Sequence, residues 1–208
     1  MPVQEDLQRQ FVEKAELVSA VVTSVASEDD ALKYVLDLCD KKEACQLLAS
    51  GCERDLSSKA EVLCDTKQQK VIAAPALGAQ TYSKLRELSE KAGFNCIDSG
   101  LREHLAGIDI GFTRADFGIA DTGTLVVDCP DEELRLTTMI SEIHVCLLST
   151  SDIYGSTYDV EEMLLERMKK NPDFLAFITG ASRTADIERV LALGVHGPLE
   201  LHILLLED

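Results

Sequence analysis

The sequence predicts a three-layer α/β domain around a mostly parallel, Rossmann-like sheet, with an N-terminal helical extension. Short apolar segments of roughly four to six residues alternate with amphipathic segments of about ten residues. The chain has 208 residues, of which 46% are hydrophobic, and this is enough to bury a substantial core without disulfides. Two apolar segments on either side of a tight turn at 121–124 add one antiparallel hairpin.

Helices are predicted first along the chain. Residues 4–26 carry an apolar stripe at three- and four-residue steps. Glu5 and Asp6 stand in the first turn of this segment, where the helix dipole favours negative charge. Ser27 is expected to cap a second helix that runs to about Asp40. We therefore expect residues 1–42 to form a helical extension packed on an α/β domain of residues 43–208.

The α/β domain is predicted to alternate between strands and helices. Further helices are expected at 61–69, 79–92, 160–170 and 185–193, with Gly93 ending the second of these and a helical turn at 103–106. Strands are expected at 71–74, 94–97, 117–120, 125–127, 144–148, 174–178 and 201–206, while 44–49 fits a strand or a buried helical turn. Ligands of open α/β sheets bind beyond the carboxyl ends of the strands, so the loops at strand ends are the places to search for a site.

The charge of the chain excludes several classes of partner. The formal net charge is −17, and the acidic excess is spread along the chain. Duplex nucleic acid and anionic membrane surfaces are therefore unlikely partners, and an anionic ligand must be held by local features. No apolar run approaches the roughly 18 residues that span a bilayer. The N-terminus lacks the apolar core of a signal peptide, so we expect a cytoplasmic protein.

The seven cysteines leave two interpretations open. In a reducing cytosol they would be free thiols, several of them buried. The alternative is a metal or iron–sulfur site built from Cys39, Cys45, Cys52 and Cys64, although their spacing matches no ligand motif. We expect the purified chain to hold no stoichiometric iron or zinc.

The first candidate loop is Ala120-Asp121-Thr122-Gly123-Thr124. Its carboxylate and two hydroxyls could clamp a polar ligand, with Asp121 as an acid, base or nucleophile. An ordinary hairpin turn explains the same residue types, because Gly supplies a positive φ while Asp and Thr bond the backbone.

The second candidate loop runs from Thr179 to Glu188 and contains Ser182, Arg183, Thr184 and Asp186. If a helix begins there, its free N–H groups and the Arg183 guanidinium could hold an anion. Alternatively, the loop only caps the helix and Arg183 pairs with a neighbouring carboxylate.

The third candidate loop is Gly194-Val195-His196-Gly197-Pro198. His196 could act as a general base or donate a hydrogen bond to a substrate oxygen. It could equally fix the turn through a structural hydrogen bond. The other histidines, His104, His144 and His202, are not spaced as metal ligands and are expected on the surface or in strands.

Together these loops resemble the three signatures of the LUD domain, the lactate-utilisation protein C family. The resemblance rests on Asp116-Phe117-Gly118-Ile119-Ala120-Asp121-Thr122-Gly123-Thr124-Leu125, on Ser182-Arg183-Thr184-Ala185-Asp186-Ile187-Glu188 and on Gly194-Val195-His196-Gly197-Pro198, and it covers about residues 70–206. Two residues depart from the family pattern: Asp121 stands where relatives often have Glu, and Ala181 where they often have Pro.

The resemblance implies a fold similar to glucosamine-6-phosphate deaminase, ribose-5-phosphate isomerase and CoA-transferases. It also implies a role in bacterial growth on L-lactate, beside iron–sulfur partner proteins that oxidise lactate to pyruvate. We expect no cofactor in this chain, because no G-x-G-x-x-G follows a predicted strand, and iron–sulfur clusters in the partners. The chain could also form a homo-oligomer. The alternative function is an independent enzyme acting on a phosphorylated, folate-type or CoA-linked small molecule.

For the site we expect Asp121 and His196 to do acid/base work. The residues expected to bind a small anionic ligand are Thr122, Gly123, Thr124, Ser182, Arg183, Thr184, Asp186 and Gly197. If the sheet is doubly wound, the three loops should converge on one pocket at its carboxyl edge.

Overall fold

The computed structural model describes residues 2–42, 69–104, 107–169, 174–187, 190–193 and 197–207, and the backbone alone within 183–193. The segment predicted at 44–49 and nearly all of the one at 61–69 lie outside these residues.

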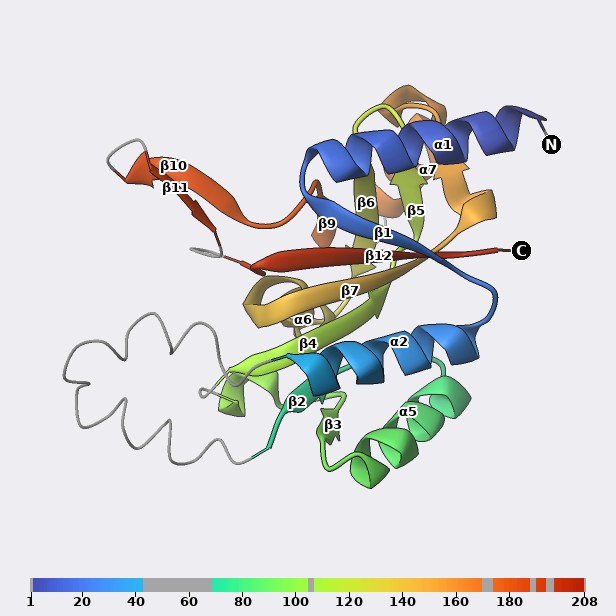
Figure 1. Cartoon of the computed structure of the whole chain (residues 1–208). Helices are drawn as coiled ribbons and strands as arrows, with labels where there is room; N and C mark the ends of the chain where they lie inside the picture. The colour runs from blue at the N-terminus through green and yellow to red at the C-terminus, as the bar shows by residue number, and fades with distance from the viewer. Residues whose placement is uncertain are drawn as a thin grey trace.

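A six-stranded, fully parallel sheet forms the centre of the molecule (Figure 1). Its strands, in spatial order, are β1 (Ala20–Val25), β12 (Glu200–Leu206), β7 (Ser141–Ser149), β4 (Ile108–Arg114), β2 (Val71–Ala73) and β3 (Asn95–Ile97). All nine residues of β7 are buried, as expected for a strand covered on both faces. The predicted α/β class with a mostly parallel sheet is confirmed.

Helices α2 (Glu28–Lys41) and α5 (Ala79–Lys91) cover one face of this sheet (Figure 1). Leu32 and Val35 of α2 and Leu85 of α5 pack there against Phe112 of β4. The predicted cap is confirmed, since the Ser27 side chain accepts a hydrogen bond from the Asp30 amide at 3.2 Å.

A smaller sheet and three helices lie on the opposite face. The small sheet has the order β8 (Ile153–Tyr154), β5 (Phe117–Ile119), β6 (Thr124–Cys129), β9 (Phe174–Ile178), and β5 and β6 form the predicted antiparallel hairpin. The helices are α1 (Pro2–Leu17), α6 (Glu132–Ile140) and α7 (Glu161–Met168), and short 3-10 turns span 101–103, 150–152 and 157–160. Phe11 of α1 packs with Leu125 and Leu148 between the two sheets.

The helix predicted at 4–26 is wrong beyond residue 17. Ser19 has a left-handed backbone (φ 66°), which ends the helix, and the next residues form β1. β1 pairs in parallel with β12, beginning at Ala20 opposite Leu201. The segment is rich in Val and Thr, whose branched side chains favour strands when a partner strand is available.

The helix predicted at 185–193 is also wrong. β10 (Arg183–Ile187) and β11 (Val190–Leu193) pair as an antiparallel ribbon that projects from the body of the molecule (Figure 1). A short apolar segment fits either periodicity, and here strand pairing outweighs helix propensity. β4 and α6 are further elements that were not predicted.

Candidate functional site

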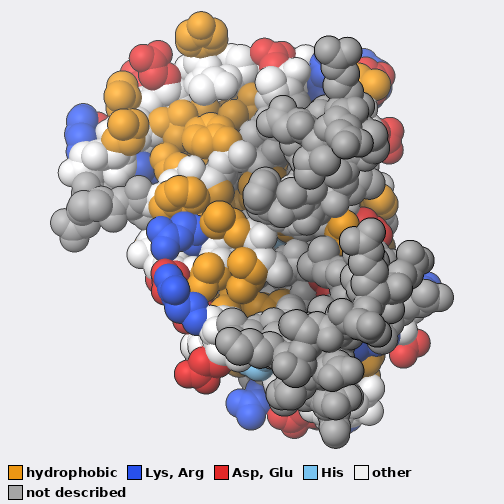
Figure 2. Space-filling view, turned by 90° about the vertical axis from the view of Figure 1, so that its left-hand side faces the viewer, with side chains coloured by type: hydrophobic (Ala, Val, Ile, Leu, Met, Phe, Trp, Pro, Cys, Tyr) orange, Lys and Arg blue, Asp and Glu red, His pale blue; other side chains and the backbone are white. Residues whose placement is uncertain are grey.

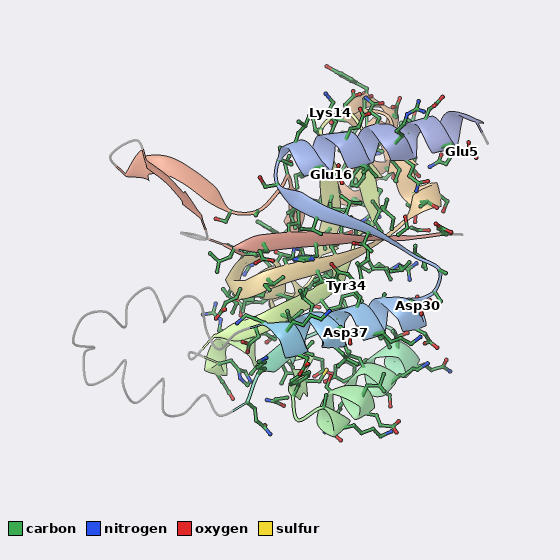
Figure 3. All side chains as sticks on the ribbon, in the orientation of Figure 1. Glu5, Lys14, Glu16, Asp30, Tyr34 and Asp37 are labelled. Carbon is green, nitrogen blue, oxygen red and sulfur yellow. The ribbon has the colours of Figure 1, made fainter. Side chains whose placement is uncertain are left out.

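The first motif forms the turn between β5 and β6, and its glycine touches α1. Gly123 has φ +63°, and a Cβ atom added there would lie 2.3 Å from the Ala15 backbone nitrogen. Lys14 precedes this contact and is labelled on α1 in Figure 3. The turn therefore needs glycine both for its conformation and for the close approach to the helix.

A chain of hydroxyl contacts runs through the first motif, and one of these contacts joins it to the second. The Thr122 Oγ1 and Thr124 Oγ1 atoms are 2.7 Å apart, and Thr124 Oγ1 is 2.7 Å from Thr179 Oγ1. Asp121 is exposed and accepts a hydrogen bond from Gln10 Nε2 of α1 at 2.9 Å. Its proposed acid/base role stays a prediction.

The second motif begins as a turn and continues into β10, not into a helix. Gly180 has φ +75°, and a Cβ atom there would lie 2.2 Å from the carbonyl oxygen of Val18, just beyond α1. Because no helix begins at Ser182, the predicted anion site at a helix N-terminus is wrong. Arg183, Thr184 and Asp186 are in β10, with side chains outside the described residues.

The third motif meets the second through its backbone. The Ser182 amide donates to the carbonyl oxygen of Pro198 at 3.0 Å. A Cβ atom on Gly197 would lie 3.2 Å from the Ser182 Cβ atom. His196 lies outside the described residues, so its predicted role stays a prediction.

These motif segments gather at the amino ends of β7 and β12. Pro198 lies two residues before β12, and the Leu199 amide donates to the carbonyl of Glu142 at 2.8 Å, near the start of β7. The predicted convergence at the carboxyl edge is therefore wrong for the second and third motifs. The edge at which these two motifs lie depends on the end of the sheet at which the β10–β11 ribbon leads into β12. Local sequence patterns do not determine this path of the chain.

A small cavity lies between the second and third motifs and the sheet. It is partly open to solvent and has room for about one water molecule. The cavity is lined by Thr138, His144, Ile178, Gly180, Ala181, Ser182, Pro198 and Leu201. Of the predicted site residues, Ser182 lines it directly.

His144 is the ionisable side chain of this cavity, and the sequence analysis did not select it. It is 1% exposed, and its Nε2 atom lies 2.8 Å from Thr113 Oγ1. Burial lowers the pKa of His144 to about 4, so the ring is neutral at physiological pH. Among the residues that the structure describes, none forms a hydrogen bond with its Nδ1 atom. The signal available in the sequence was a polar residue within an otherwise apolar buried strand.

A second, larger hollow lies at the carboxyl edge of the sheet. It offers about 340 Å³ of space when the adjoining open solvent is included, and it is lined by Glu28, Leu32, Ala76, Leu77, Gly78, Thr81, Phe112, Arg114 and Leu147. Glu28 Oε1 accepts from Arg114 Nη1 at 2.8 Å, and Glu28 Oε2 accepts from Thr81 Oγ1 at 3.0 Å. The chain leaves β2 toward β3 and leaves β4 toward β7, so this hollow lies where the strand order reverses.

Within the described residues, no group of three or more His, Cys, Asp or Glu side chains could hold a metal. Four cysteines, Cys39, Cys96, Cys129 and Cys146, are buried free thiols, while Cys45, Cys52 and Cys64 lie outside the described residues. In the same part of the chain, no helix has the length and apolar character needed to cross a bilayer.

Comparison with known proteins finds one matching family model and several relatives. The family model described as the LUD domain matches residues 8–206. An uncharacterized Neisseria meningitidis protein is 40% identical over 110 residues, covering 52% of this chain and 46% of that protein. YkgG of Escherichia coli is 24% identical over 205 residues, covering 95% and 78%. Lactate utilization protein C of Halalkalibacterium halodurans is 31% identical over 103 residues, covering 48% and 45%.

The match thus spans less than half the length of the Neisseria and Halalkalibacterium proteins. Among solved structures, a DUF162 family protein from Deinococcus radiodurans has the same fold. It has a TM-score of 0.56 and 16% identity, with 98% of each chain covered. The parallel sheet, the three sequence motifs and the family match over nearly the whole chain lead to one conclusion: this chain belongs to the LUD domain family.

Proposed function

We propose that this chain is a cytoplasmic component of a lactate-utilisation system, acting beside iron–sulfur proteins that oxidise L-lactate to pyruvate. Its part would be to bind a small anionic ligand at the three motifs. The observation that carries the proposal is the contact between motifs that lie far apart in sequence. Thr124 touches Thr179, and Ser182 touches Pro198 beside a cavity. Relatives named lactate utilization protein C support the biological role.

In this proposal the iron–sulfur clusters belong to the partner proteins, and the chain itself carries no cofactor. Figure 2 views the side of the molecule at which the β10–β11 ribbon lies and shows hydrophobic side chains gathered there. Exposed hydrophobic residues of α6 and β9 include Met139 and Phe177, 48% and 49% exposed.

Arg183 would supply the positive charge that an anionic ligand needs in a chain of net charge −17.

A second candidate function is an independent enzyme acting on a phosphorylated, folate-type or CoA-linked molecule. The observation that favours it is the hollow at the carboxyl edge, where α/β sheets commonly bind ligands. Arg114 stands in this hollow and could meet an anionic group if its ion pair with Glu28 opened.

Affinity purification from the native host, without oxygen, tests the first proposal against the second. The tagged chain should retain iron–sulfur proteins, identified by mass spectrometry, together with their iron. Light scattering on the same sample gives the number of copies of this chain. Recovery of the chain without iron–sulfur proteins, together with turnover of a phosphorylated or CoA-linked substrate, would support the second candidate.

A further inference from the structure

We propose that β9 pairs with the β9 strand of a second copy of this chain, in antiparallel orientation about a two-fold axis at Ala176. The two small sheets, of four strands each, then form one continuous sheet. This inference concerns an interaction surface, and it does not depend on the ligand or the partners of the proposed function.

β9 is an apolar strand at the edge of the small sheet. It pairs with β6 on one side, and no other strand of the described residues pairs with it. Its five residues, Phe-Leu-Ala-Phe-Ile, include no charge and no proline, and their register with β6 has no bulge. Charges, prolines and bulges are the usual means by which proteins keep an exposed edge from pairing. An edge without them, on which Phe177 is 49% exposed, is therefore expected to pair with a further strand.

The backbone of β9 leaves two residues available for such pairing. The Asp116 amide, directly before β5, donates to the carbonyl of Val126 at 2.9 Å, so the backbone of Val126 faces β5. Successive residues of an antiparallel strand point their N–H and C=O groups to opposite sides, so Val127 faces β9, where it stands opposite Ala176. By the same alternation, the N–H and C=O groups of Leu175 and Phe177 point away from β6.

These outward-facing groups make the strand complementary to itself. Of the antiparallel registers that join outward-facing residues, the one centred on Ala176 pairs all five residues of both strands. It sets Leu175 opposite Phe177 of the second copy, and each such pair exchanges two backbone hydrogen bonds. The two side chains of a pair lie on the same face of the sheet and meet across the seam. A two-fold interface requires this kind of self-complementarity.

Charge favours a second copy at this strand over contact elsewhere on the surface. The chain has a net charge of −17, so two copies repel each other wherever acidic side chains meet. A contact centred on β9 brings the two copies together along a strand that carries no charge. A strand of another protein would have to match the same order of backbone groups and apolar side chains, whereas a second copy supplies that match in every molecule.

Disulfide cross-linking of the full chain tests the register. In the proposed pairing, Ala176 faces Ala176 of the second copy with the two Cα atoms about 4.5 Å apart, within the range that a disulfide bridges. Ala176→Cys should therefore form a cross-linked dimer under mild oxidation. Phe177→Cys is the matched control, because the two copies of this position would lie about 8–9 Å apart, too far for a disulfide. Phe177 is the more exposed of the two, so random collisions would cross-link Phe177→Cys better. Wild type, oxidised in the same way, gives the background from the native cysteines.

Sedimentation equilibrium tests the interface without cross-linking. A seam this short predicts a weak dimer, half formed at a chain concentration of roughly 10–100 µM. Phe177→Asp removes two cross-strand contacts and places two charges in the seam, so it should raise the Kd of the dimer about tenfold or more. Tyr158→Asp is the matched control, because it removes an aromatic side chain that is 86% exposed in the turn at 157–160, outside β9. It should leave the Kd unchanged, and circular dichroism checks that both variants are folded.

Three results would overturn the proposal. A wild-type chain that stays monomeric well above this concentration range would leave the β9 edge to a strand of another protein. A dimer in which Phe177→Cys cross-links as well as Ala176→Cys would lack the proposed register. Equal Kd values for the two aspartate variants would place the dimer contact on another surface.

Discussion

Replacement of Gly123 by alanine measures how tightly the first motif holds α1. The added Cβ atom would lie 2.3 Å from the Ala15 nitrogen and 2.6 Å from the Lys14 carbonyl carbon. A left-handed conformation costs an L-residue about 1–2 kcal/mol, and overpacking adds about 1–3 kcal/mol. We therefore expect Gly123→Ala to lower the free energy of unfolding by about 2–5 kcal/mol.

Gly93→Ala is the matched control for this experiment. Gly93 also has a left-handed backbone (φ +82°), but an added Cβ atom would have no neighbour within 4 Å. It should therefore cost only about 1–2 kcal/mol. Urea unfolding followed by circular dichroism gives both values, and the melting temperatures should differ by about 2–12 °C. Equal destabilisation by the two variants would refute the close contact between the motif turn and α1.

Three other predictions concern the cavity and the buried thiols. Burial lowers the pKa of His144 from 6.5 to about 4 in the folded chain, so between these pH values the unfolded chain binds a proton that the folded chain does not. Wild type should therefore lose about 3 kcal/mol of stability relative to His144→Gln as the pH falls from 6.5 to 4. Urea unfolding at several pH values measures this difference, and parallel curves would contradict it. Burial raises the pKa of the Cys39 and Cys146 thiols to about 12, so native-state alkylation followed by peptide mass spectrometry should leave both unmodified, with the urea-unfolded chain as control. Arg183→Ala should weaken the binding of a small carboxylate or phosphate ligand by about 1.5–3 kcal/mol in calorimetry, and an unchanged affinity in a folded variant would leave Arg183 a structural residue.

Local sequence patterns were sufficient to predict the elements whose ends are determined by nearby residues. The α5 helix, predicted at 79–92, spans Ala79–Lys91, and Gly93 follows it with the left-handed backbone that ends a helix. The hairpin around Gly123 was predicted for the same reason, because its turn residues are determined within a few positions.

Elements that depend on distant partners were predicted poorly. β1 was assigned to a helix because its apolar spacing continued that of α1, yet it forms a strand along β12 from the far end of the chain. The segment at 185–193 is predicted as a helix from its local pattern, but it pairs as two strands, β10 and β11. Helix propensity is a weak preference that such pairing can override.

The sequence by itself determined the α/β class, the family and the motif residues, because periodicity, capping and turn chemistry act over a few positions. Only the tertiary structure decided that the second and third motifs lie at the amino ends of β7 and β12. It alone placed His144 beside them, with one ring nitrogen 2.8 Å from Thr113 Oγ1 and the other without a partner among the described residues. The physical reason is that hydrogen-bond satisfaction and burial depend on what packs around a side chain, and residues distant in sequence supply those neighbours.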